Sequence, residues 1–90
     1  AIHSARFMNI AVIILTYNEE RHIARAINSV ARICNHVLVV DSHSTDRTRE
    51  IAASLGARVV EHSFVNCATQ FNWALEQLPP GTQWVLRLDA

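Results

Sequence analysis

The chain has 90 residues, of which 50% are hydrophobic and 18% are charged, and its formal net charge is zero. This size and composition suit one small globular domain, or a piece of a larger one. Nucleic acids and anionic membranes usually select a basic face, so the balanced charge argues against nucleic acid as a partner and against a membrane as the main one.

The two cysteines, Cys34 and Cys67, form no Cys-x-x-Cys pair. Isolated thiols of this kind predict a reduced, cytoplasmic protein. The longest apolar run, residues 10–15, is far shorter than the roughly 20 residues that span a bilayer, and the N-terminus lacks the pattern of a secretory signal. Residues 1–7 do not fit the pattern that follows, so we interpret them as a tag or non-native leader and place the domain at 8–90.

The first strand is expected over residues 11–15, which are apolar and rich in β-branched side chains. Such a continuous run is typical of a strand that is buried on both faces. Asn18 then offers a helix N-cap, with Glu19 and Glu20 in the first turn, where the helix dipole favours negative charge. Apolar residues at helical spacing predict that this helix continues to residues 33–35.

A second buried strand is expected over residues 37–40, and it runs directly into Asp41. Ser44 or Thr45 is a suitable cap for the helix that follows. Gly56 stands where a glycine commonly ends a helix, because the position requires a left-handed backbone.

The third strand is expected over residues 57–61, whose polar ends favour a place at the sheet edge. Asn66 can open a third helix, which the segment 79–81 (Pro-Pro-Gly) ends. Residues 84–88 predict a fourth strand, which leads into Asp89.

This alternation of strands and helices predicts an α/β fold, a Rossmann-like three-layer sandwich with four parallel strands in the order 3-2-1-4. In such sheets ligands bind at the carboxyl ends of the strands, near the point where the strand order reverses. The strand ends bring Tyr17, Asp41 and Asp89 toward one crevice. Because the chain stops at Ala90, directly after the last acid, we expect it to be a fragment of a longer protein.

A single aspartate after a strand is most often a helix cap or a solvated loop residue, but two such acids beside Tyr17 favour a binding site. Strand-end carboxylates can accept hydrogen bonds from a base or a ribose, or bind a divalent cation. The glycine-rich phosphate loops of dinucleotide-binding proteins and P-loop enzymes are absent, which makes a metal the better partner for a diphosphate. Gln70 or Asn72, early in the third helix, could also face the crevice.

Four segments, in this order and spacing, resemble the family 2 glycosyltransferases of the GT-A fold: residues 12–20, 39–48, 70–75 and 84–90. Within the family the chain looks most similar to bacterial enzymes of lipopolysaccharide core or capsule-type polysaccharide synthesis. The resemblance implies an inverting, metal-dependent hexosyltransferase that uses a nucleotide-sugar donor, most simply a UDP-sugar, and a saccharide or lipid-linked acceptor.

The resemblance also assigns roles to individual residues. Tyr17 would stack on the nucleotide base, Asp41 would accept the N–H of a uracil ring, and Asp89 would be the first acid of an Asp-x-Asp motif that holds Mg²⁺ or Mn²⁺. The second acid and the general base would lie beyond Ala90, so no catalytic residue is expected within the chain, and the fragment itself is expected to be inactive. The nucleotide-binding residues implied are Thr16, Tyr17, Asn18, Glu19, Asp41, Ser42, His43, Gln70 and Asn72.

The chain departs from the family pattern at two positions: His43 stands where a glycine is usual, and Phe71 where a basic residue is common. Arg87 is also unusual, because it lies inside a strand that should be central. Two alternatives stay open: a non-catalytic nucleotide- or metal-binding α/β module and, less favoured because the chain has no lysine, a receiver-like signalling domain. We expect a cytoplasmic protein, peripheral at the inner face of the membrane when full length, and self-association of the fragment through its cut sheet edge.

Overall fold

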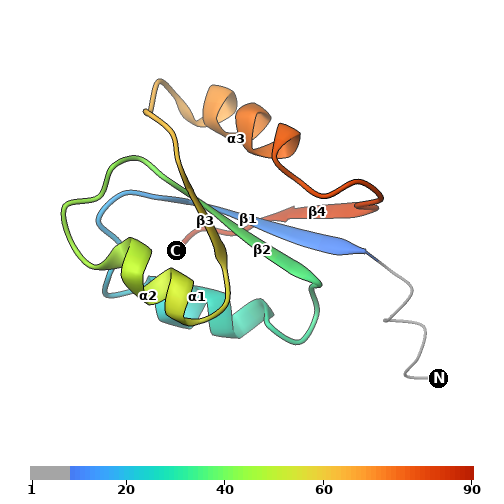
Figure 1. Ribbon diagram of the computed structural model, residues 1–90, viewed down its shortest axis with the longest axis horizontal. Coiled ribbons are helices and arrows are strands. Elements are labelled where there is room, and N and C mark those ends of the chain that lie inside the picture. Colours follow the sequence, from blue (N-terminus) through green and yellow to red (C-terminus); the bar gives the residue numbers. More distant parts are fainter. Residues whose placement is uncertain (1–8) are drawn as a thin grey trace.

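The computed structural model describes residues 9–90, which form four strands and three helices in strict alternation (Figure 1). The bounds of the elements, in chain order, are β1 Ile10–Thr16, α1 Ile23–Val30, β2 His36–Asp41, α2 Thr48–Ser54, β3 Arg58–Glu61, α3 Cys67–Glu76 and β4 Trp84–Arg87.

The strands make one parallel sheet in the order β3-β2-β1-β4, as the sequence predicts. In the register of β1 and β2, Thr16 lies opposite Asp41, and Asp41 in turn lies opposite Glu61 of β3. The carboxyl ends of the two central strands therefore stop level with each other. The loops that follow them leave the sheet at the same edge.

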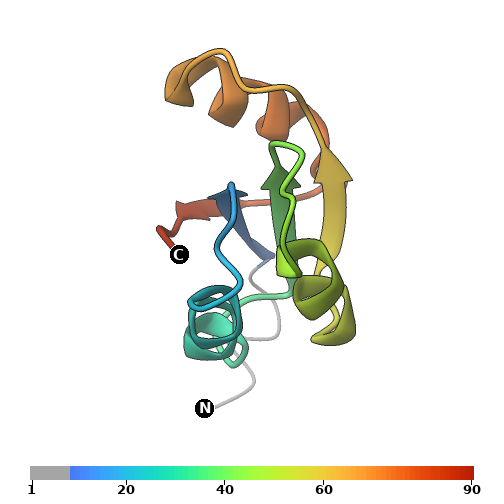
Figure 2. The same ribbon diagram turned by 90° about the vertical axis from the view of Figure 1, so that its left-hand side faces the viewer.

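The helices cover both faces of the sheet and complete the predicted three layers (Figures 1 and 2). Val12, Ile14 and Val39 point to the face on which α1 and α2 pack. Ile13 and Leu38, their alternate neighbours, belong to a second cluster with residues of α3. Both central strands are thus buried on both sides, which explains their continuous apolar sequences.

Helix α1 begins later and ends earlier than the sequence predicts. Asn18 does not cap it, and the backbone of Asn18 has a positive φ of 51°. The helix begins at Ile23, after a turn in which the backbone carbonyl oxygen of Glu19 accepts hydrogen bonds from the backbone N–H groups of His22 and Ile23. The helix ends at Val30. The predicted cap was wrong because the Asn18 side chain bonds to a different part of the chain.

Helix α2 begins at Thr48, so neither Ser44 nor Thr45 caps it. Asp46 accepts the backbone N–H of Thr48 at 2.9 Å instead, and Ser44 turns toward Asp41. Asn66 does cap α3 as predicted, because its side chain accepts the backbone N–H of Thr69 at 2.8 Å.

Candidate functional site

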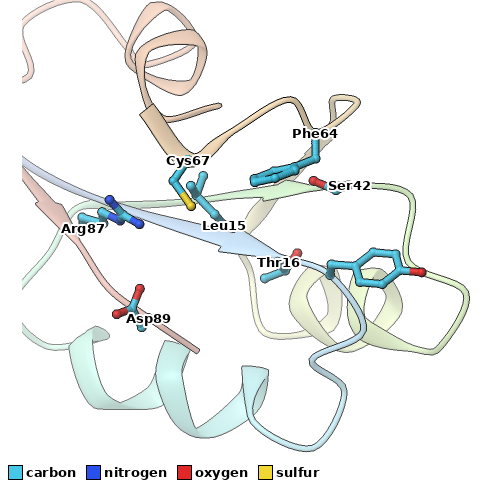
Figure 3. Close-up of a pocket in the computed structure, with 8 residues that line it drawn as sticks. Leu15, Thr16, Ser42, Phe64, Cys67, Arg87 and Asp89 are labelled. Carbon is cyan, nitrogen blue, oxygen red and sulfur yellow. The ribbon is translucent and has the colours of Figure 1, made fainter. Parts of the chain in front are cut away.

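A cavity of about 510 Å³ opens at the carboxyl ends of the strands, lined from the ends of β1, β2 and β4 and from the segment that leads into α3 (Figure 3). This is the edge at which parallel α/β sheets bind ligands. The residues that line it are Leu15, Thr16, Tyr17, Ser42, Phe64, Cys67, Arg87 and Asp89. Four of the predicted site residues, Thr16, Tyr17, Ser42 and Asp89, therefore meet at one cavity.

Two exposed aromatic side chains contribute to the cavity wall, Tyr17 after β1 and Phe64 between β3 and α3. Tyr17 is 58% exposed and Phe64 is 55% exposed, although large aromatic side chains are usually covered. Phe64 was not among the predicted site residues. Its only signal in the sequence is that Phe64 and Val65 are apolar residues in a loop, where no strand or helix pattern places them in the core.

Asp41 lies behind the cavity wall, with 0% of its surface exposed. Its Oδ1 accepts hydrogen bonds from Thr16 Oγ1 at 2.7 Å and Ser44 Oγ at 2.5 Å, and its Oδ2 accepts the Ser44 backbone N–H at 2.7 Å. The guanidinium of Arg49 approaches Oδ2, with Nε at 3.8 Å. In this arrangement the buried carboxylate accepts three hydrogen bonds from the protein, and the next residue, Ser42, lines the cavity.

Asn18 and Glu19 connect the loop after β1 to the loop after β2. The Asn18 backbone N–H donates to Ser44 Oγ at 2.8 Å, and Asn18 Oδ1 accepts the Thr45 backbone N–H at 2.8 Å. The Glu19 backbone N–H donates to Thr48 Oγ1 at 2.8 Å. The two residues thus hold the loops together, and neither lines the cavity.

The Asp46 carboxylate completes this connection. Its Oδ1 accepts the Thr48 hydroxyl at 2.5 Å, and its Oδ2 accepts the Glu20 backbone N–H at 3.2 Å. Partial desolvation acts to raise the pKa of Asp46, but the hydrogen bonds from Thr48 and Glu20 outweigh it and hold the pKa below its ordinary value of 3.8. Asp46 therefore belongs to the scaffold of the loops.

His43 occupies a backbone position that suits glycine, because its φ is 58°. Its imidazole does not line the cavity. Nδ1 lies 3.2 Å from Glu61 Oε2, and Nε2 lies 3.3 Å from Ser63 Oγ. His43 thus has a left-handed backbone although it carries a side chain, and that side chain contacts Glu61 of β3 and Ser63 in the loop after β3.

The two predicted site residues of α3 face in different directions. Gln70 is 1% exposed and bonds to Ser42 and His62 beneath the cavity wall. Asn72 is exposed on the helix and does not line the cavity. In the arrangement of residues 9–90, Asn72 therefore does not contact a ligand bound in this cavity.

Asp89 and Arg87 come from the C-terminal end of β4 and line the same cavity (Figure 3). Within residues 9–90 no three acidic, histidine or cysteine side chains gather closely enough to hold a metal ion. One exposed carboxylate nevertheless fits a Mg²⁺ or Mn²⁺ ion of the kind that proteins hold through one or two carboxylates, with waters and substrate phosphates as the other ligands. Arg87, which is unusual because it lies inside a strand, adds a positive charge to the part of the cavity wall that Asp89 lines.

Residues 11–90 match the sequence profile of the family described as Glycosyl transferase family 2. The chain belongs to this family. A glycosyltransferase of Rickettsia typhi, named as uncharacterized, is 44% identical over 81 residues, which are 90% of this chain and 27% of that protein. A dolichyl-phosphate hexose transferase of Haloferax volcanii is 45% identical over 58 residues, which cover 61% of this chain and 25% of that protein. The chain thus spans about a quarter of the length of these relatives.

Solved structures agree with this assignment and with the GT-A fold. Glucosyl-3-phosphoglycerate synthase of Mycobacterium tuberculosis superposes with a TM-score of 0.81 at 25% identity, over 98% of this chain and 36% of that protein. That structure is a complex with Mn²⁺, UDP and glucosyl-3-phosphoglycerate, and another structure of the same enzyme contains Mg²⁺ and UDP.

Proposed function

We propose that the chain is the nucleotide-sugar-binding part of a metal-dependent, inverting glycosyltransferase whose donor is a UDP-sugar. The observation that carries the proposal is the cavity at the carboxyl ends of the strands, which combines Tyr17 and Phe64 near Ser42 with Asp89 on the β4 side. Aromatic rings suit a nucleobase and a carboxylate suits a divalent cation bound to phosphates. The UDP and Mn²⁺ in the synthase from Mycobacterium tuberculosis support the same pairing.

In this function Tyr17 packs against the base and Ser42 contacts its edge, while Asp89 holds Mg²⁺ or Mn²⁺. The metal, when bound, supplies positive charge that stabilises the departing diphosphate. Residues 9–90 contribute binding and orientation. The general base that activates the acceptor belongs to another part of the full-length protein, so this chain alone is inactive.

The wider role we propose is synthesis of a bacterial cell-surface polysaccharide, with a saccharide or lipid-linked acceptor. The name of the dolichyl-phosphate hexose transferase supports a lipid-linked acceptor for that relative. The relative in Rickettsia typhi is a bacterial protein, which supports the bacterial setting of the proposal. None of the helices within residues 9–90 has the length and apolar character that crossing a membrane requires. As a separate proposal, the full-length protein works in the cytoplasm, peripheral at the inner face of the membrane.

The proposal is tested by calorimetric titration of the chain with UDP and with ADP, each with and without Mn²⁺. We expect UDP to bind more tightly than ADP, and Mn²⁺ to strengthen the binding of UDP. Asp89→Asn should remove the effect of Mn²⁺ and keep the preference for UDP. Equal binding of both nucleotides would contradict the proposal and favour the alternative of a general nucleotide- or metal-binding module.

A further inference from the structure

The hydroxyl groups at the carboxyl ends of β1 and β2 differ in what they do with their protons. Thr16 and Ser44 each donate to the buried carboxylate of Asp41, and Thr48 donates to Asp46. Ser42 is the exception: its Oγ accepts a hydrogen bond at 3.1 Å from Nε2 of Gln70. Within residues 9–90 the structure records no acceptor for the Ser42 proton, and Ser42 lines the cavity.

The direction of the Gln70 amide is fixed by its other partners. Nε2 lies 3.0 Å from the backbone carbonyl oxygen of His62, which can only accept, so this end of the amide must be the NH₂ group. The opposite end, Oε1, lies 2.7 Å from His62 Nδ1, which therefore carries the proton of this hydrogen bond. A reversed amide would set two acceptor oxygens against each other.

Packing keeps this arrangement in place. Gln70 is 1% exposed, so no water competes for its amide. The imidazole of His62 stacks on Trp73, which lies on α3 like Gln70, with 4.1 Å between ring centroids and 21° between the ring planes. A buried amide whose two ends are both paired is costly to rotate, because rotation would leave buried polar groups unsatisfied.

We infer that Gln70 is a positioning residue that makes Ser42 a hydrogen-bond donor toward the ligand in the cavity. Because the Ser42 oxygen accepts from Gln70, its proton is directed to an acceptor atom of the ligand. This inference rests on the proposed function, and it specifies the contact: a carbonyl oxygen of the nucleobase lies against Ser42. Uracil offers two such oxygens and adenine offers none, so the contact contributes to the choice of a uridine nucleotide.

The test compares UDP with 2-thio-UDP and 4-thio-UDP, because a thiocarbonyl sulfur is a much weaker acceptor than oxygen. Binding to the chain is measured by calorimetry with Mn²⁺ present. We expect one of the two thio analogues to bind about three- to tenfold more weakly than UDP, the range that one hydrogen bond spans. In Ser42→Ala this ratio should fall to within about twofold of unity, because the donor is gone.

Gln70→Met should also reduce the ratio, because the serine hydroxyl then loses the partner that orients it. Ser54→Ala, at an exposed serine of α2, and Gln77→Met, at the end of α3, are the matched controls and should keep the ratio of the unmodified chain. Since Ser42→Ala removes a single oxygen, it still tests the contact between Ser42 and the base if Gln70→Met fails to fold. A folded Gln70→Met that keeps the ratio of the unmodified chain would overturn the positioning role of Gln70.

The two failures are distinguishable. If UDP binds but the ratio is the same in the unmodified chain and in Ser42→Ala, or if neither thio analogue is weakened, the role assigned to Ser42 and Gln70 is overturned while the proposed function stands. If UDP does not bind the unmodified chain at all, both are overturned.

Discussion

Thr16 Oγ1 lies 2.7 Å from Asp41 Oδ1, in a contact that joins the ends of β1 and β2 inside the protein. The two residues are directly opposite in the sheet register and both are buried. The Asp41 carboxylate is therefore an anchor for two loops, through Thr16 on one side and Ser44 on the other. This position predicts that the main effect of replacing Asp41 is a loss of folding stability.

Asp41→Asn should lower the free energy of unfolding by about 2–4 kcal/mol, because an amide nitrogen would face other donors and leave them unsatisfied. Urea denaturation measures the loss. Asp89→Asn is the control and should leave stability unchanged, because Asp89 is an exposed acid of the same cavity. If Asp41→Asn keeps full stability but loses the preference for uridine, then Asp41 contacts the base directly, as the family resemblance implies.

The strand order was predictable because each strand is a short apolar run and the strands alternate with helices, which implies right-handed crossovers in a parallel sheet. What the pattern could not provide is which of two neighbouring residues at a strand end faces the ligand. Asp41 and Ser42 differ by one position, and side chains alternate between faces. The sequence analysis named both residues and assigned the contact with the base to Asp41, whereas the structure buries Asp41 and brings Ser42 to the cavity.

The starts of α1 and α2 were mispredicted for a related reason. Asn18 has the composition of an N-cap, but its side chain accepts a hydrogen bond from Thr45, which is 27 residues away. Local capping rules contain no information about such a partner. Gln70 is a similar case, because its buried amide is explained only by Ser42 and His62, which come from two other segments.

Tyr17 should contribute to nucleotide affinity through its ring. Tyr17→Ala is expected to weaken UDP binding about tenfold, since base–aromatic stacking contributes about 1–3 kcal/mol. Tyr17→Phe keeps the ring and should bind within about twofold of the unmodified chain. Stability should not change in either variant, because the side chain is 58% exposed. Equal affinities of the Ala and Phe variants would contradict a stacking role.

Cys67 offers a chemical probe of the cavity, because it is exposed and lines the wall (Figure 3). Iodoacetamide should modify Cys67 before Cys34, since burial raises the pKa of the Cys34 thiol and reduces its thiolate fraction. UDP with Mn²⁺ should slow the modification of Cys67 and leave the rate at Cys34 unchanged. Mass spectrometry of the two cysteine peptides measures both rates.

ADP at the same concentration is the control and should protect Cys67 less than UDP does. Equal rates at Cys67 with and without UDP, under conditions where calorimetry detects binding, would place the nucleotide outside this cavity.

The free edge of β4 should cause the chain to self-associate. Within residues 9–90, β4 pairs with β1 on one side only, and its Trp84 and Leu86 side chains are exposed. An uncovered edge of this kind is a template for pairing with another strand. Sedimentation equilibrium should therefore show dimers or larger species at high concentration, and Trp84→Lys should reduce them. Leu55→Lys, on a different part of the surface, is the control and should not.

His36 should make stability depend on pH near neutrality. Burial, and secondarily repulsion from Arg58, lowers the pKa of His36 below its ordinary 6.5, and its buried Nε2 has no hydrogen-bond partner among residues 9–90. The folded state thus disfavours the protonated ring. Above pH 6.5 the ring is neutral in both states, and as the pH falls from 6.5 through the lower folded-state pKa, the unfolded chain binds the proton more readily and stability is lost.

Urea denaturation between pH 8 and pH 5 measures this loss, and His36→Leu should make the decline shallower by removing the group that causes it. His22→Gln, at an exposed histidine of the loop before α1, serves as the comparison and should retain the steeper decline. If the curves of His36→Leu and the unmodified chain run parallel, another group causes the pH dependence. If His36→Leu is also the more stable variant at pH 7, the unpaired Nε2 destabilises the fold in its neutral form as well.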